Sequence, residues 1–189
     1  YSEYFTKQFF IELKDDRVQN LSKLIKDYSA ENKATVLKGD CNILIPKVLK
    51  EIHPKAPTFV FLDPSGDHIQ WQTIKILSKW KTELFLLYPY NVTIARYLPI
   101  NPVTQKKWQK ERLNTFFGTN EWEYIYNNRP RIYLTEELLK LYTKRLKEIG
   151  YKHLIISDCF RSTTGQKLYY MIWVGKHPVG KKIMNWVNE

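Results

Sequence analysis

The sequence has few cysteines, few glycines and no long apolar run, and each shortage excludes a class of protein. Two cysteines in 189 residues cannot form the disulfide framework of a small secreted protein. The longest apolar stretches, 84–88 and 168–174, are far shorter than the roughly 20 residues of a membrane-spanning helix. The chain does not open with the charged and then apolar segments of a secretory signal peptide. We therefore expect a cytoplasmic protein that does not act at a membrane.

The positions of the glycines exclude two common nucleotide-binding motifs. No two of the seven glycines lie closer than five positions, so the chain contains no G-x-G-x-x-G fingerprint. Gly175, Gly180 and Lys181 have the spacing of a P-loop, but Lys182 stands where that motif needs a Ser or Thr for magnesium, and Pro178 interrupts the loop. The four histidines and two cysteines lack metal-ligand spacing, so we predict no metal site.

What the chain has in excess is positive charge. Lys and Arg number 30 against 19 Asp and Glu, which gives a net charge of +11. Hydrophobic residues at 43% are enough to form a core, so the charge belongs to a folded domain and not to a disordered tail. An excess of this kind is typical of proteins that neutralise phosphates, which makes nucleic acid, DNA or RNA, the expected partner. A lysine-rich surface that only keeps the protein soluble is the alternative.

Strand-like runs alternate with helical stretches through the first half of the chain. Buried strands are expected at 9–13, 35–37, 58–63 and 83–88, because these runs are rich in apolar, β-branched and aromatic residues. Helical spacing of apolar residues fills the intervals between them. The alternation predicts βαβ units in an α/β fold with a mostly parallel sheet, formed by a single domain over residues 1–189.

The second half differs in character. Residues 99–134 are predicted to form an insertion that contacts substrate, since their first part is rich in Pro, Gln, Lys and Arg. Thr135 is expected to cap a helix over 136–149 that ends at Gly150. Strands at 153–160 and 167–174, joined by a turn-like segment, predict a C-terminal antiparallel hairpin.

Three carboxylates follow predicted strands and are candidate ligand-binding groups. Glu12, Asp40 and Asp63 each stand at a strand end, and ligands of open α/β sheets bind beyond the carboxyl ends of the strands. A carboxylate there can accept both hydroxyls of a ribose, and one at the next strand can accept from an adenine amino group. The alternative is that each carboxylate caps the helix that follows it.

The segment Asp63-Pro64-Ser65-Gly66 is the most specific local signal. Pro64 favours an extended conformation at Asp63, and Gly66 permits a sharp turn. A carboxylate and main-chain carbonyls held there would orient the N–H bonds of an amino group while its nitrogen attacks an electrophile. An ordinary D-P-x-G turn is the alternative.

Basic and aromatic side chains are interleaved in the predicted insertion. Lys106 and Lys107 precede Trp108, a combination that can pair with phosphates and stack on an unpaired base. The remaining predicted substrate contacts are Tyr88, Arg96 and Lys176. Tyr88, or Tyr90 two positions further on, could stack on a base flipped out of a duplex.

The ordered set of motifs resembles one known family, the three-Cys-motif partner proteins, over most of the chain. The motifs that resemble the family are Phe-Phe-Ile-Glu12 with Arg17, Gly39-Asp40, Phe61-Leu62-Asp63-Pro64-Ser65-Gly66, Leu113-Asn114 with Phe116-Phe117-Gly118 and Trp122, and Tyr170 to Gly175 with Lys176-His177-Pro178 and Gly180. These proteins look like class I S-adenosylmethionine-dependent methyltransferases, and the tetrapeptide at Asp63 is also similar to that of amino-methylating enzymes.

The resemblance implies roles for the three carboxylates. Glu12 would meet the cofactor ribose and Asp40 the adenine, with Cys41 beside them, while Asp63 to Gly66 would hold the nitrogen to be methylated. It also implies a Rossmann-like sheet whose first strand and glycine-rich loop are missing from this chain, which begins just before the second strand. We expect those residues to lie upstream of Tyr1.

Together these observations predict an S-adenosylmethionine-dependent methyltransferase that acts on a nitrogen of a nucleic-acid base. The alternative is a catalytically inactive subunit with a methyltransferase-like fold that binds nucleic acid or a partner protein.

Overall fold

The computed structural model describes residues 5–63, 68–91 and 93–188, and side chains up to residue 185. Its contacts divide the chain into two compact units, residues 1–53 and residues 54–189. The single domain predicted over 1–189 stays a prediction, and each unit is described by itself. Within the described residues, no helix combines the length and the apolar character needed to cross a bilayer.

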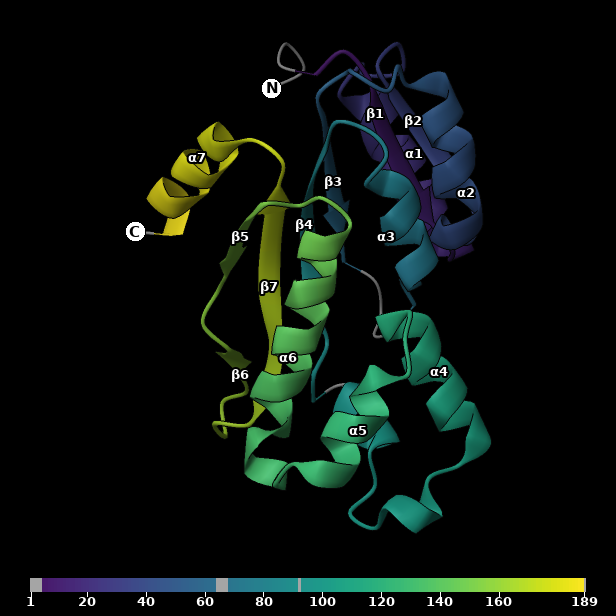
Figure 1. Cartoon of the computed structure of the whole chain (residues 1–189). Coiled ribbons are helices and arrows are strands. Elements are labelled where there is room, and N and C mark those ends of the chain that lie inside the picture. Colours follow the sequence, from purple (N-terminus) through teal and green to yellow (C-terminus); the bar gives the residue numbers. More distant parts are fainter. Residues whose placement is uncertain (1–4, 64–67, 92, 189) are drawn as a thin grey trace. The chain divides into compact units, whose positions relative to one another are not determined.

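Unit 1 is built around a pair of parallel strands. β1 (Gln8–Glu12) and β2 (Ala34–Lys38) pair in register from Gln8 opposite Ala34 to Glu12 opposite Lys38. The crossover between them contains α1 (Asp15–Asp27), as a parallel connection requires. α2 (Cys41–Val48) and the short 3-10 helix η1 (Leu49–Glu51) follow β2 (Figure 1).

Unit 2 contains a five-stranded mixed sheet. Its strands are β3 (Thr58–Leu62), β4 (Thr82–Tyr88), β5 (His153–Ile156), β6 (Phe160–Arg161) and β7 (Lys167–Gly175). The order is β3-β4-β7-β5, and β6 pairs with β7. β3 and β4 are parallel, whereas β7 is antiparallel to both β4 and β5 (Figure 1).

The predicted fold class, a mostly parallel Rossmann-like methyltransferase sheet, is therefore wrong. The described strands form one small parallel pair and one mixed sheet in which β7, the longest strand, pairs antiparallel on each side. Apolar runs identify a buried strand, but they do not determine its neighbour or its direction. The antiparallel pairing of β5 with β7 is the predicted C-terminal hairpin. The alternation of strands and helices in the first half did not predict that β1 and β2 form a sheet of their own or that β7 pairs antiparallel with β4.

The predicted insertion at 99–134 is largely helical. It contains η3 (Pro102–Thr104), α4 (Lys107–Phe117), α5 (Glu121–Asn128) and the first turn of α6 (Arg131–Glu148). The other helical elements of unit 2 are α3 (Trp71–Leu77), η2 (Ile94–Tyr97) and α7 (Pro178–Asn188).

An aromatic cluster packs these helices against the sheet. Tyr88 of β4 is fully buried, with its ring centroid 5.2 Å from that of Tyr142 on α6 and 5.8 Å from that of Phe116 on α4. Tyr142 stacks on Phe116 at 4.9 Å and meets the edge of Trp71 from α3 at 5.6 Å. Contacts between these buried rings stabilise unit 2 and fix α3, α4 and α6 relative to β4.

Candidate functional site

The first two predicted carboxylates lie at one edge of the parallel pair in unit 1. Glu12 is the last residue of β1 and stands opposite Lys38, the last residue of β2. The main-chain N–H of Gly39 donates to the Glu12 carbonyl at 2.9 Å, and Asp40 comes next. Both acidic residues thus follow the carboxyl ends of adjacent parallel strands, the edge at which open α/β sheets bind ligands.

Glu12 also organises the turn that leads into α1. Its Oε1 accepts the N–H of Leu13 at 2.8 Å and that of Lys14 at 2.9 Å. Arg17 Nη1 lies 3.7 Å from Oε2. The hydrogen bond from the Lys14 N–H is the main reason why the pKa of Glu12 is lowered, with further help from Leu13 and Arg17. The group is therefore ionised at neutral pH, and its two main-chain bonds use only Oε1.

Asp40 is the N-cap of α2. Its Oδ1 accepts the Asn42 N–H at 2.8 Å and the Asn42 side-chain amide at 2.9 Å. Cys41 beside it is half-buried, and burial, followed by the charge of Asp40, raises the pKa of its thiol. The thiol of Cys41 is thus uncharged at neutral pH and is not a thiolate nucleophile. The capping alternative describes the bonds of Asp40, whereas Glu12 accepts from two N–H groups that precede α1, whose N-cap, Lys14, makes no side-chain capping bond.

The third predicted carboxylate is in unit 2. Asp63 directly follows Leu62, the buried last residue of β3, and is itself exposed. Pro64, Ser65 and Gly66 lie outside the described residues. The catalytic assignment of this tetrapeptide stays a prediction, supported by the position of Asp63 at the carboxyl end of a strand.

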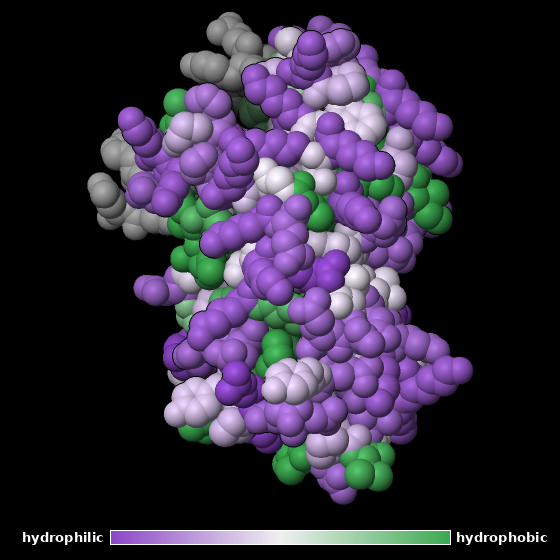
Figure 2. All heavy atoms as spheres, in the orientation of Figure 1, coloured by the Kyte–Doolittle hydropathy of each residue, from purple (hydrophilic) through white to green (hydrophobic). Residues whose placement is uncertain are grey.

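A basic and aromatic surface, here called the Trp108 surface, consists of Arg96, Tyr97, Lys106, Lys107 and Trp108. The ring of Trp108 is half-exposed and meets that of Tyr97 edge-on, with centroids 5.4 Å apart. Arg96, Lys106 and Lys107 are exposed. The face of the molecule over α4 is mostly hydrophilic in the space-filling view (Figure 2). The structure therefore brings Arg96 together with the three predicted residues of the insertion.

Two glutamines hold η2 against the start of α4 and so form this surface. Gln105 Nε2 donates to the Tyr97 carbonyl at 2.8 Å, and Gln109 Nε2 donates to the Arg96 carbonyl at 3.2 Å. The Gln109 Oε1 accepts the Lys106 N–H at 2.8 Å, so the third helical residue of α4 bonds back to the N-cap residue. These bonds to main-chain groups fix the position of the Arg96 backbone relative to the start of α4, and so relative to Trp108.

Tyr88 and Lys176, both predicted to bind substrate, take part in the packing of unit 2. Tyr88 lies in the aromatic cluster, where burial raises the pKa of its phenol; its Oη is buried without a hydrogen-bond partner among the described residues. Lys176 Nζ donates to the carbonyls of Ser78 and Trp80, the latter at 2.7 Å, and burial lowers its pKa. Their assignment to substrate stays a prediction.

The structure also forms a pocket that the sequence did not reveal, here called the Trp71 pocket. It measures about 250 Å³ and is lined by Gln70, Trp71, Gln72, Lys75, Asn114, Thr115, Gly118 and Arg145. These residues come from α3, α4 and α6 or the residues that cap them. No sequence signal marks it, because no two of the contributing segments are adjacent in the chain.

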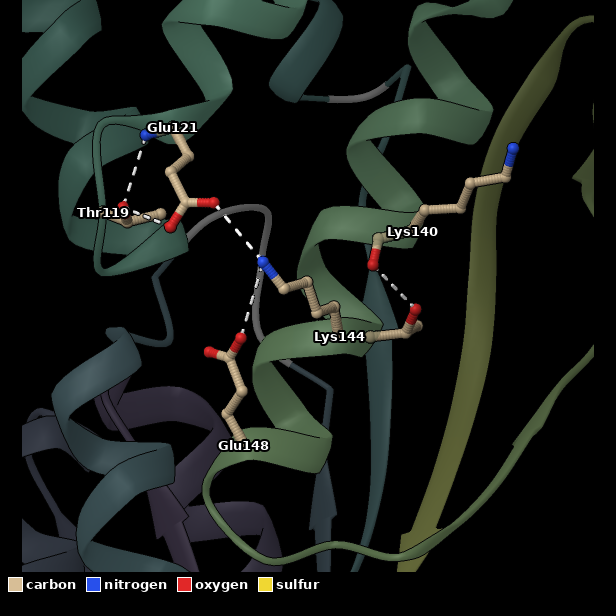
Figure 3. A network of polar contacts seen from close by, with 6 residues as sticks. Thr119, Glu121, Lys140, Lys144 and Glu148 are labelled. Atoms are coloured by element: carbon tan, nitrogen blue, oxygen red, sulfur yellow. Dashed lines mark hydrogen bonds and ion pairs between the residues drawn. The ribbon is translucent and has the colours of Figure 1, made fainter.

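Lys144, next to Arg145 on α6, pairs with one acidic side chain of α5 and one of α6. Its Nζ lies 3.8 Å from Glu121 Oε2 and 3.6 Å from Glu148 Oε1 (Figure 3). Thr119 in turn accepts the Glu121 N–H at 3.3 Å. The two carboxylates thus pair with Lys144, whereas Arg145, the next residue in the chain, lines the Trp71 pocket.

Neither the models of known protein families nor the curated proteins contain a match to this chain. The functional assignment therefore depends on the groups described above and on the motif resemblance.

Proposed function

We propose that this protein is an S-adenosylmethionine-dependent methyltransferase that acts on a nitrogen of a nucleic-acid base. The observation that supports this most directly is the placement of Glu12 and Asp40 beyond the carboxyl ends of two adjacent, parallel, in-register strands. Ligands of α/β proteins bind at that edge.

The chemistry of these carboxylates fits an adenosine group. Their main-chain bonds use Oε1 of Glu12 and Oδ1 of Asp40. The second oxygen of Asp40, and Oε2 of Glu12 beside Arg17, can each accept from a ribose hydroxyl or an amino group. The thiol of Cys41 would add an uncharged contact. When bound, S-adenosylmethionine supplies an electrophilic methyl group, so the protein need only position the acceptor nitrogen.

Asp63 is the group proposed to position that nitrogen. An exposed carboxylate after a strand can accept an N–H of the base amino group and orient its lone pair. The Trp108 surface supplies what a nucleic-acid substrate needs, namely exposed cations for phosphates and an exposed indole for stacking.

A second candidate is a non-catalytic subunit that binds nucleic acid or a partner protein. It is favoured by the hydrogen bonds of Glu12 and Asp40, because Glu12 closes the turn before α1 and Asp40 caps α2, which explains both residues without a cofactor.

Tritiated methyl transfer to cellular RNA and DNA separates the two candidates. Asp63→Ala should lower the rate by about 100- to 1000-fold, the usual effect of losing one preorganised group. Asp158→Ala removes the same charge from another exposed position of unit 2 and should leave the rate unchanged. Full activity in Asp63→Ala would refute the catalytic assignment. A folded parent protein that binds nucleic acid without transferring methyl groups would establish the second candidate.

A further inference from the structure

The Trp71 pocket is positively charged. Lys75 and Arg145 are its two ionisable residues, and its other lining residues are neutral. Among the described residues, neither cation forms an ion pair. The carboxylates of Glu121 and Glu148 pair with Lys144, which precedes Arg145 in the chain (Figure 3). The pocket therefore presents two positive charges with no acidic side chain to neutralise them.

Arg145 is held in place by Trp71. Its guanidinium carbon lies 4.8 Å from the centroid of the indole, a cation–π contact, and Trp71 is 4% exposed. Nε of Arg145 is buried and has no hydrogen-bond partner among the described residues. A buried charged donor in this state is unfavourable unless a ligand supplies an acceptor.

Asn114 adds a neutral donor with a defined orientation. Its Oδ1 accepts the indole N–H of Trp122 at 2.8 Å. Because an indole N–H can only donate, the side-chain oxygen of Asn114 must face it, and the amide NH₂ is left to donate elsewhere. The Trp71 pocket thus combines a guanidinium, an ammonium and an amide donor.

The size of the pocket limits its ligand to one small group. At about 250 Å³ it is smaller than the ~300–1,000 Å³ pockets that enclose drug-sized molecules. A guanidinium and an ammonium together are the usual ligands of a phosphate. The net charge of +11 and the Trp108 surface on the same unit favour a polyanionic partner.

We propose that the Trp71 pocket binds one backbone phosphate of a nucleic-acid strand. This inference rests on the proposed function, because it takes the nucleic-acid substrate as its partner. It adds a specific anchoring point, formed by α3, α4 and α6, that positions the strand without contacting a base.

The first test measures the anisotropy of a fluorescein-labelled single-stranded oligonucleotide at several salt concentrations. Lys75→Gln should weaken binding about tenfold and lower the slope of log affinity against log salt by ~0.7, the value for one phosphate contact on a single strand. The loss should be the same for oligonucleotides of different sequence. Lys79→Gln is the matched control, since it removes the same charge from an exposed position just after α3 and outside the pocket.

Arg145→Gln should show the same loss, and Arg145→Lys should restore only part of the affinity, because a lysine keeps the charge without the planar fork. If Lys75→Gln and Arg145→Gln bind the oligonucleotide as tightly as Lys79→Gln, the proposal is overturned.

The second test uses the indole N–H signal of Trp71 in a ¹H–¹⁵N NMR spectrum, identified by its absence in Trp71→Phe. Both inorganic phosphate and the oligonucleotide should shift it in the parent protein, and the shifts should be reduced in Lys75→Gln. A shift with phosphate but none with the oligonucleotide would overturn the proposal in favour of a site for free anions.

The outcomes separate this inference from the proposed function. If the parent transfers methyl groups but the Lys75 and Arg145 variants bind the oligonucleotide as tightly as the parent, only the phosphate site is refuted. Pocket-dependent binding of the oligonucleotide without methyl transfer would refute the enzyme and keep the phosphate site.

Discussion

Gly118 lies so close to Trp71 that a Cβ atom on it would come within 2.1 Å of Trp71 Cδ1. The same glycine ends α4 in the left-handed conformation, with φ of 64°. Two separate requirements, backbone conformation and close approach, therefore meet at one residue. Together they let the end of α4 pack against the start of α3, where the Trp71 pocket forms.

Gly118→Ala should destabilise unit 2 by about 2–5 kcal/mol. Roughly 1–2 kcal/mol comes from the left-handed backbone and another 1–3 kcal/mol from overpacking against the indole. Gly165→Ala is the control, because Gly165 also has positive φ, 79°, but a Cβ there would meet nothing within 4 Å. Urea denaturation of both variants measures the difference. Equal losses of stability would show that the contact with Trp71 costs nothing.

Lys176→Met should lower the stability of unit 2 by about 1–3 kcal/mol, since the carbonyls of Ser78 and Trp80 would lose a charged donor. Lys181→Met, on an exposed position of α7, should change stability little. Thermal denaturation of the two variants provides the comparison. A stable Lys176→Met protein with weakened oligonucleotide binding would instead support the substrate role that the sequence predicts.

The sequence predicted where strands lie better than how they pair. The run 58–63 was expected as a strand and β3 covers Thr58–Leu62, because a short apolar run between turn residues has few alternatives. The antiparallel pairing of β5 with β7 agrees with the predicted C-terminal hairpin, but β7 also pairs with β4, which lies far from it in the chain. Such pairing leaves no periodic signal, and this is why the sheet was predicted incorrectly.

The start of α6 shows a second kind of error. Thr135 was expected to cap a helix at 136, but α6 begins at Arg131, and Thr135 is buried inside it. The Arg131 guanidinium donates to the carbonyls of Leu98 and Pro99 at 3.0–3.2 Å, which ties the first turn to a distant segment. A contact with residues more than 30 positions away outweighs a local capping preference.

The residues of the candidate sites also differ in whether the sequence could predict their position. Glu12 and Asp40 could be placed at one sheet edge from the sequence, because adjacent parallel strands end together. Arg145 could not be assigned to a pocket with Trp71, since only the packing of α3, α4 and α6 brings them together.

The contribution of Glu12 to stability should depend on pH. Its pKa is lower in the folded protein, so the stabilisation is complete above the unfolded value of about 4.3 and is lost as the pH falls through the folded value. Glu12→Gln should therefore be less stable than the parent at pH 7, and the gap should narrow towards pH 3. Urea titrations at both pH values test this, with Glu31→Gln, an exposed turn position, as control. A gap that is independent of pH would mean that the charge of Glu12 is irrelevant to the turn.

Trp108→Ala should weaken oligonucleotide binding by about 1–3 kcal/mol without changing its salt dependence. The energy is that of one base stacked on an aromatic ring, and no charge is removed. Trp108→Phe should retain part of the affinity, because a smaller ring still offers a stacking face. Tyr124→Ala, which removes another exposed ring of unit 2, is the matched control. Lys106→Gln and Lys107→Gln should also weaken binding, but unlike Trp108→Ala they should lower the slope of log affinity against log salt. The reason is that each loses a charge that pairs with a phosphate. Anisotropy titrations over a range of salt concentrations distinguish the two effects. If Trp108→Ala and Tyr124→Ala bind equally well, the indole at the Trp108 surface makes no contact with the nucleic acid, and the bound strand follows another face of unit 2.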